Sequence, residues 1–185
     1  MTTKLLSGLA ITAIALASQS ALASDGTINF SGSITSQTCS INGGAADGSR
    51  NIAFSLPRTP QSSLAVLNST AGETAFAIAL TGCTPASGTV STRFESGSTV
   101  DLTSGELLTS GGGGTTSLHV QLLNEDRSVI NVGAPDVSQN SIGKTIPAGG
   151  AVTLNYFARY KRAAATPALG SGAIAASVTY SLIYN

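Results

Sequence analysis

The 185-residue chain contains a single histidine, His119, which restricts the chemistry that it can perform. A metal centre needs several His, Cys or carboxylate ligands at suitable spacing, and one histidine does not supply them. A Ser-His-Asp hydrolase would have to use His119, but the sequence has no Gly-x-Ser-x-Gly elbow or comparable nucleophile context. His119 lies on the face opposite its apolar neighbours and is expected to face solvent. We therefore expect no enzyme, no metal site and no cofactor.

Charge is also scarce, since Asp, Glu, Lys and Arg make up 10% of the residues, with nine basic and nine acidic side chains. The basic residues are scattered, whereas nucleic-acid binding requires a basic patch, so we expect no nucleic-acid partner. The pair Glu125-Asp126 beside Arg127 fits a polar turn better than a general acid and base. The run Gly111–Gly114 has no following Lys-Ser/Thr and is interpreted as a loop tip rather than a phosphate cradle.

A hydrophobic run of about 20 residues, as a transmembrane helix needs, is missing as well. The N-terminus has instead Lys4, a shorter apolar stretch over residues 5–17 and the small-x-small triplet Ala21-Leu22-Ala23. This is the pattern of a secretory signal peptide, so residues 1–23 are predicted to be removed. A retained N-terminal anchor is the alternative interpretation.

Only two cysteines occur, Cys39 and Cys83, in a chain predicted to reach an oxidising compartment. A disulfide between them is therefore expected. Closing a loop of about 45 residues would stabilise the fold by roughly 4 kcal/mol in the chain-entropy model. Free thiols or a catalytic cysteine are disfavoured, because no CxxC spacing and no second histidine accompany them.

Apolar residues recur with a period close to two along most of the chain, and Gly and Pro interrupt the pattern often. The clearest internal examples are Ile52-Phe54-Leu56, Phe76-Ile78-Leu80, Leu118-Val120-Leu122 and Val152-Leu154-Tyr156. Such alternation is typical of half-buried β-strands. Many short strands with few helical stretches predict an all-β, antiparallel sandwich.

The two ends of the chain carry the most specific pattern. Ahead of the first cysteine, Ile28, Phe30 and Ile34 alternate with polar residues. At the C-terminus the even positions of residues 174–184 are apolar, while the odd positions of residues 173–181 are small or hydroxylic. This last strand would leave an exposed edge that something must cover. An ordinary first strand and an ordinary edge strand are the alternative interpretations.

Four segments occur in order along the chain: Gly26-Thr-Ile-Asn-Phe-Ser-Gly-Ser-Ile34 ahead of Cys39, Phe76-Ala-Ile-Ala-Leu-Thr-Gly-Cys83, Phe157-Ala-Arg-Tyr160 and the alternating segment Gly172–Tyr184. Together they resemble the type 1 fimbrial subunit family, which is assembled by the chaperone–usher pathway. The resemblance implies an incomplete immunoglobulin-like sandwich that lacks its last strand. A donor strand from a neighbouring subunit would complete it.

On this resemblance, residues 24–38 would form the N-terminal donor-strand extension and residues 39–185 the pilin domain, with Cys39 and Cys83 as the family's disulfide. The donor residues would be Ile28, Phe30, Gly32 and Ile34. The acceptor groove and chaperone contact would comprise Gly172, Ile174, Ala176, Val178, Tyr180, Leu182, Tyr184 and Asn185. Basic residues of the chaperone would hold the carboxylate of Asn185.

The resemblance also implies the function: a structural subunit of a surface pilus (fimbrium) that polymerises by donor-strand exchange and supports cell adhesion. Its expected partners are neighbouring pilus subunits, a periplasmic chaperone and an outer-membrane usher. The chain would pass through the periplasm to the cell surface. A self-contained secreted binding module, such as a small adhesin, is the alternative. An adaptor or minor subunit would share every feature used here.

Overall fold

The computed structural model describes the following parts of the chain: residue 34 and residues 36–44, 50–112 and 116–185. The contacts divide the chain into two units, residues 1–34 and residues 35–185. All described helices and strands belong to the second unit. The predicted signal peptide and most of the predicted N-terminal extension lie outside the described residues.

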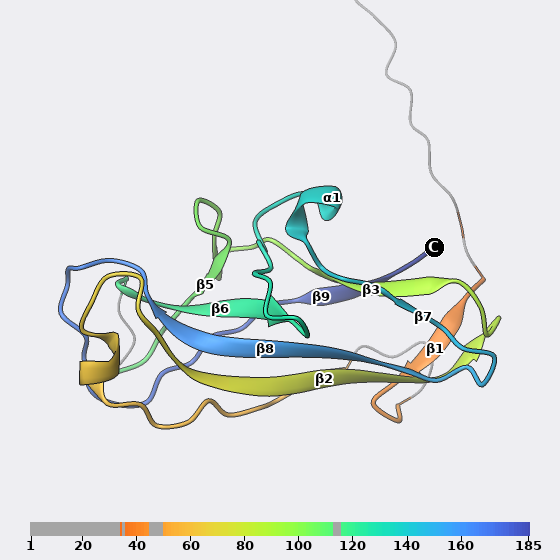
Figure 1. The fold of residues 1–185 in the computed structure, drawn as a ribbon, viewed down its shortest axis with the longest axis horizontal. Helices are drawn as coiled ribbons and strands as arrows, with labels where there is room; N and C mark the ends of the chain where they lie inside the picture. Colours follow the sequence, from red (N-terminus) through yellow and green to blue (C-terminus); the bar gives the residue numbers. More distant parts are fainter. Residues whose placement is uncertain (1–33, 35, 45–49, 113–115) are drawn as a thin grey trace, which may run out of the picture. The chain divides into compact units, whose positions relative to one another are not determined.

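The second unit is built from two antiparallel sheets (Figure 1). Among the described residues the larger sheet has six strands in the order β1-β2-β8-β6-β5-β4. Their bounds are Thr38–Ile41 (β1), Thr70–Thr84 (β2), Val152–Arg162 (β8), Leu118–Asn124 (β6), Glu106–Leu108 (β5) and Val100–Asp101 (β4). The long strands β2 and β8 are neighbours in this sheet, where Ile78 lies opposite Leu154.

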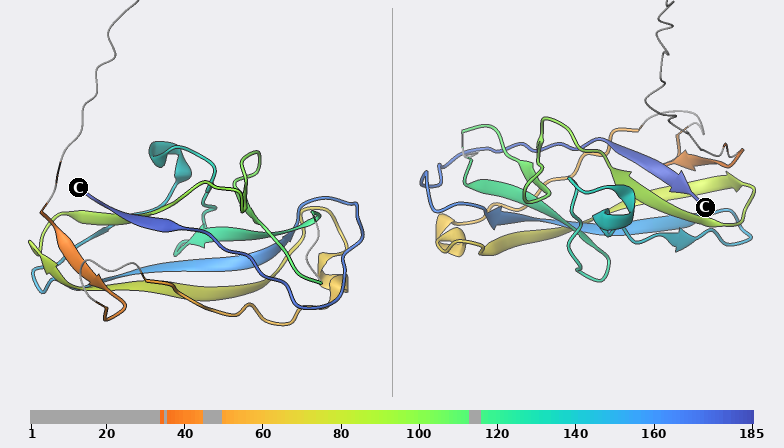
Figure 2. Two further views of the ribbon diagram at one scale, coloured as in Figure 1. Left: turned by 180° about the vertical axis from the view of Figure 1, so that it is seen from behind. Right: turned by 90° about the horizontal axis from the view of Figure 1, so that it is seen from above.

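The smaller sheet has the order β7-β3-β9, and its last strand reaches the C-terminus (Figure 2). The bounds are Lys144–Thr145 (β7), Thr89–Phe94 (β3) and Tyr180–Tyr184 (β9). Within the part of the chain that the structure describes, β9 pairs with β3 alone. It is therefore an edge strand, with one side of its backbone left open.

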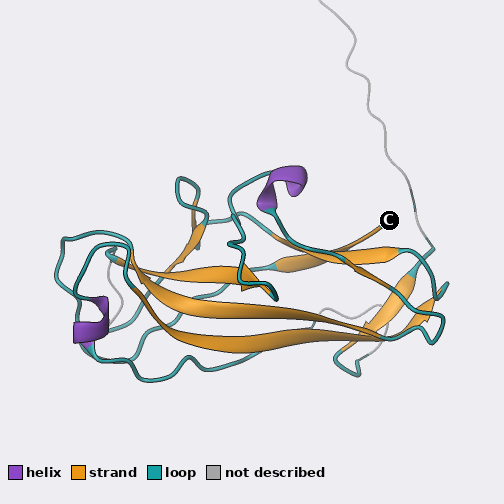
Figure 3. Cartoon of the chain, viewed as in Figure 1, coloured by secondary structure: helices purple, strands orange, loops and turns teal. Residues whose placement is uncertain are grey.

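Among the residues that the structure describes, helix is limited to two single turns, η1 (Gln61–Leu64) and α1 (Asp136–Gln139), and strands and loops make up the rest (Figure 3). The turn α1 positions one buried side chain, Gln139, whose amide pairs with the backbone of Phe94 in β3. Gln139 Nε2 donates to the Phe94 carbonyl at 2.8 Å, and Gln139 Oε1 accepts from the Phe94 N–H at 2.8 Å. The side chain thus takes the place of a neighbouring strand at this point of β3.

The core lies between the two sheets and follows from alternation along the strands. In β8, Leu154, Tyr156 and Ala158 are buried, whereas the residues between them face the other side of the sheet. Apolar residues of β2, β3 and β6 join the same cluster. The predicted antiparallel sandwich is confirmed, and so are the strands predicted around residues 76–80, 118–122 and 152–156.

The predicted disulfide is confirmed: Cys39 of β1 is bonded to Cys83 of β2, and both residues are buried. It joins the edge strand β1 to the end of its neighbour β2, where Thr38 lies opposite Thr84. The bridge therefore fixes the point at which the chain enters the sandwich.

Two strand predictions were wrong in extent. Residues 52–56 alternate as a strand would but belong to no strand, and the C-terminal strand covers residues 180–184 instead of residues 172–184. A strand requires a neighbouring backbone with which to form a hydrogen-bond ladder. Among the described residues, the backbone of residues 172–179 forms only an isolated bridge between Ala175 and Ser110 and one hydrogen bond from the Glu95 N–H to the Thr179 carbonyl. Alternation records which side chains are buried, but it does not record whether a partner strand is present.

Candidate functional site

An apolar groove of about 770 Å³ opens between residues 50–56 and residues 174–182. Its floor is formed by side chains from both sheets: Phe76, Ile78, Phe94, Leu107, Val120, Leu122 and Tyr160. Phe76, Tyr156 and Phe94 form an aromatic cluster at this level of the core, with ring centroids 5.5 Å and 5.3 Å apart. The groove therefore reaches down to the centre of the sandwich.

The first wall of the groove, residues 50–56, is held by side chains. Phe54 stacks on Phe76 with a centroid distance of 4.8 Å, and Ile52 and Leu56 pack against the core. Among the described residues, residues 51–56 form no backbone–backbone hydrogen bond. Their N–H and C=O groups are thus free to pair with an additional strand.

The second wall is the open edge of β9 and the residues that precede it. The backbones of Thr89 and Asn185 exchange two hydrogen bonds, of 2.7 Å and 2.9 Å. In an antiparallel pair, hydrogen-bonded and non-hydrogen-bonded positions alternate, so the odd residues of this segment pair with β3. The bond from the Glu95 N–H to the Thr179 carbonyl fits the same alternation. The N–H and C=O groups of Tyr180 and Leu182 therefore point toward the groove side of β9.

Polar contacts hold β9 firmly against β3. The hydroxyl of Ser181 donates to Glu95 Oε1 at 2.6 Å, and Arg93 Nε lies 2.9 Å from Glu95 Oε2. The Ser181 hydroxyl, followed by Arg93, lowers the pKa of the Glu95 carboxyl. Glu95 is thus ionised at neutral pH and links the end of β3 to β9.

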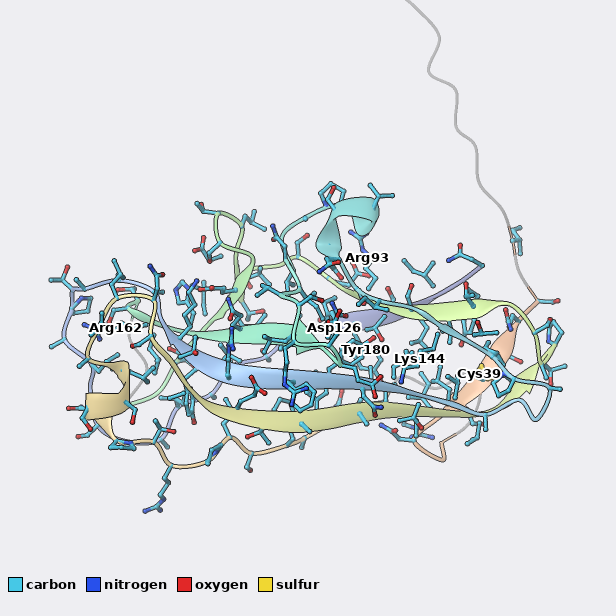
Figure 4. All side chains as sticks on the ribbon, viewed as in Figure 1. Cys39, Arg93, Asp126, Lys144, Arg162 and Tyr180 are labelled. Atoms are coloured by element: carbon cyan, nitrogen blue, oxygen red, sulfur yellow. A yellow bond between two sulfur atoms is a disulfide. The ribbon has the colours of Figure 1, made fainter. Side chains whose placement is uncertain are left out.

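The phenol of Tyr180 reaches from β9 to the opposite wall (Figure 4 labels Tyr180). Its Oη donates a hydrogen bond of 2.9 Å to the carbonyl of Arg50. Burial raises the pKa values of the Tyr180 and Tyr160 phenols above their ordinary range. Both phenols are therefore protonated at neutral pH and able to donate.

The sequence-predicted groove residues divide into two sets. Those that line the groove are Ile174, Ala176, Val178, Tyr180 and Leu182. Those absent from its lining are Gly172, Tyr184 and Asn185. Tyr184 packs against the core beyond the end of the groove, and Asn185 completes the ladder with Thr89.

The predicted donor residues Ile28, Phe30 and Gly32 lie outside the described residues. Ile34 is described and is fully exposed. Sequence reasoning missed the first wall, although the alternation of Ile52, Phe54 and Leu56 signalled that this segment turns its apolar side chains to one face.

His119 was predicted to face solvent, and this was wrong. It does lie on the face of β6 opposite the core, but only 5% of its surface is exposed. Its Nδ1 lies 3.2 Å from Glu106 Oε2, and Glu106 also accepts from Gln121 and from Lys161. Arg159 completes the network through two hydrogen bonds to Gln121 Oε1, of 3.0 Å and 2.7 Å. Long side chains of β8 reach across this face, which strand alternation alone does not reveal.

Two further findings apply only to residues that the structure describes. No group of three or more His, Cys, Asp or Glu side chains is placed to hold a metal ion. Neither helical turn is long and apolar enough to cross a membrane.

The turn at Glu125-Asp126 is a polar hairpin tip, as predicted, with the Ser128 N–H donating to Asp126 Oδ1 at 2.9 Å.

Comparison with known proteins gives matches along nearly the whole chain. The profile of the family FimA, described as type-1 fimbrial protein A, matches residues 56–185. The major fimbrial subunit SMF-1 of Stenotrophomonas maltophilia (strain K279a) is 40% identical over 177 residues, covering 93% of this chain and 99% of the relative. The F17 fimbrial protein of Escherichia coli is 35% identical, covering 92% of this chain and 94% of the relative.

Solved structures show the same fold. The P pilus rod subunit PapA superposes with a TM-score of 0.58 at 24% identity, covering 80% of this chain and 99% of that subunit. A structure of a chaperone–usher pilus, described as revealing the basis of rod uncoiling, gives a TM-score of 0.57 at 24% identity, covering 88% of this chain and 96% of that one. These likenesses confirm the immunoglobulin-like sandwich.

Proposed function

This chain belongs to the type-1 fimbrial protein family and is a structural pilus subunit, and from this premise we propose that a strand from a neighbouring copy fills its groove. The predicted non-enzymatic, structural role is thereby confirmed, as is the cell-surface pilus as its location. The proposal concerns how copies assemble, which residues form the donor strand and which form the groove that accepts it.

One observation carries the proposal: among the described residues, the apolar groove lies between two backbone edges that both lack a partner strand. Residues 51–56 form no backbone ladder among the described residues, and the groove side of β9 is open. An inserted strand would pair with both edges and bury alternate side chains against the floor. A compact small molecule would fill the volume but would leave the two edges unpaired.

The N-terminal segment has the pattern that such a groove requires. Ile28, Phe30 and Ile34 would point to the floor, and Gly32 would let the backbone approach closely where no side chain fits. Burying three large apolar side chains at roughly 1.5–3 kcal/mol each contributes about 5–9 kcal/mol before ordering costs. The groove belongs to one copy and the segment to the next, so the family's assembly into pili follows directly.

We further propose that a periplasmic chaperone fills the same groove before assembly and that an outer-membrane usher receives the complex. Support comes from the open edge of β9 and from the wall residue Phe54, which is 43% exposed, since an unpaired edge beside exposed apolar surface is an aggregation hazard. The groove residues Ile174 to Leu182 would meet the chaperone strand. The carboxylate of Asn185 lies just beyond them and would be held by basic chaperone residues.

Peptide binding tests the proposal. A synthetic peptide with the sequence of residues 24–37 is expected to bind the monomeric chain and to dissociate slowly. A control peptide of equal length, with Ser in place of Ile28, Phe30 and Ile34, is expected to bind at least about 100-fold more weakly, because it loses the buried apolar area. Isothermal calorimetry or fluorescence anisotropy measures both. Equal affinity of the two peptides would show that the apolar side chains of the segment do not bind in the groove, and the proposal would then fail.

A further inference from the structure

Two sets of hydrogen bonds join the segments that form or adjoin the two walls of the groove. Outside the groove lining, Gln61 of η1 donates from Nε2 to the carbonyls of Leu169 and Gly170, at 3.0 Å and 2.9 Å. Between two residues of the lining, Tyr180 Oη donates to the carbonyl of Arg50 at 2.9 Å. Among the described residues, the Tyr180 bond is the one hydrogen bond that joins residues 50–56 to residues 172–182. It therefore spans the open part of the groove.

Tyr180 and Arg50 both line the groove and belong to opposite walls, so the hydrogen bond between them crosses it. A strand lying between the walls would occupy the space that the phenol crosses. It would also offer its own N–H groups to the wall that contains the Arg50 carbonyl. The bond between Tyr180 and Arg50 and a fully seated strand are thus incompatible.

We propose that the hydrogen bond from the Tyr180 hydroxyl to the Arg50 carbonyl acts as a strap across the empty groove. An incoming strand must break this bond before it can seat. The inference rests on the proposed function, since it concerns how that strand enters. The strap holds the unsupported wall of residues 50–56 near β9 while the groove is empty. It therefore limits exposure of the floor and slows entry of a strand, without contributing to the filled state.

Tyr180→Phe tests the strap, because it removes the hydroxyl and keeps the ring. The mature chain, residues 24–185, is kept dilute enough to be monomeric and mixed with a fluorescent peptide carrying the sequence of residues 24–37. The association rate constant is expected to rise about fivefold, the factor that corresponds to one ordinary hydrogen bond. The dissociation rate constant is expected to stay unchanged, because neither filled complex contains the bond. Stopped-flow fluorescence gives the two constants separately.

Tyr184→Phe is the matched control, since Tyr184 belongs to the same strand but does not line the groove. Its association rate constant should remain within about twofold of the unsubstituted value. An unchanged association rate in Tyr180→Phe would overturn the strap while leaving the proposed function intact. A changed dissociation rate would also overturn it, because the hydroxyl would then act in the filled state. If the unsubstituted chain does not bind the peptide at all, the proposed function itself fails.

Discussion

Deleting residues 24–34 is expected to reduce polymer formation by at least about 100-fold while leaving the groove able to bind an added strand. The deletion removes the apolar residues predicted to fill the neighbour's groove, which supply about 5–9 kcal/mol before ordering costs. It stops at the boundary between the two units and keeps Gln37, whose Nε2 donates to the carbonyls of Pro85 and Ser87. Electron microscopy and size-exclusion chromatography of the purified chain measure the polymer.

The control for this deletion is a full-length chain in which Ile28, Phe30 and Ile34 are replaced by Ser. It retains the length of the segment and loses only its apolar side chains, so it should be as defective as the deletion. The peptide of residues 24–37 should bind both variants as it binds the parent chain. Polymers of normal yield from the truncated chain would mean that the N-terminal segment is not the donor.

Removing the disulfide, by Cys39→Ala together with Cys83→Ala, is expected to lower the free energy of unfolding by about 4 kcal/mol. The sulfurs join residues 44 positions apart, and opening a loop of this size restores that much chain entropy to the unfolded state. Domains of this kind have a total stability of about 5–15 kcal/mol. With its groove open, the single chain also lacks part of the burial that the sandwich provides. Urea unfolding of the monomer, followed by circular dichroism, measures the loss.

Reduction of the unsubstituted chain by dithiothreitol provides the comparison, because it breaks the disulfide but leaves both cysteine side chains in place. The two measurements should agree within about 1 kcal/mol. Addition of the donor peptide should raise the midpoint of both forms, because a ligand bound to the folded state adds to its stability. A loss below about 1 kcal/mol in both forms would contradict the role assigned to the bridge.

The sequence was informative wherever burial on one face of a strand decides the residue type. Leu154, Tyr156 and Ala158 alternate with residues of the opposite face, and they occupy the core as that pattern predicts. The pairing of Cys39 with Cys83 needed only their number and the predicted compartment. The groove side of Val178, Tyr180 and Leu182 follows from the same period of two.

The sequence was less informative where the outcome depends on a partner in space. Ile52, Phe54 and Leu56 alternate as strand residues do, yet they form a wall without a ladder, because strand formation depends on a second backbone. His119 lies on the predicted face but is buried in a network with Glu106, which Lys161 reaches from β8. Neither the missing partner strand of residues 52–56 nor the burial of His119 can be predicted from residues nearby in the sequence.

The hydrogen bond from Tyr180 to Arg50 also depends on a partner in space, since it joins residues 130 positions apart in sequence. Tyr180 satisfies the apolar alternation of the last strand as any large apolar residue would. Only its place opposite the wall of residues 50–56 makes its hydroxyl important. The proposed strap could therefore be recognised from the structure but not from the sequence.

Residue-resolved amide hydrogen exchange on β9 tests the central claim most directly. In the monomer, the amides of Ser181 and Ile183 pair with β3 and should be protected, whereas those of Tyr180 and Leu182 face the open groove and should exchange fast. In the polymer, or with the peptide of residues 24–37 bound, Tyr180 and Leu182 should become protected as well, with exchange slowed by at least about 100-fold. If these two amides exchange equally fast in monomer and polymer, no strand pairs with this edge, and the account is wrong.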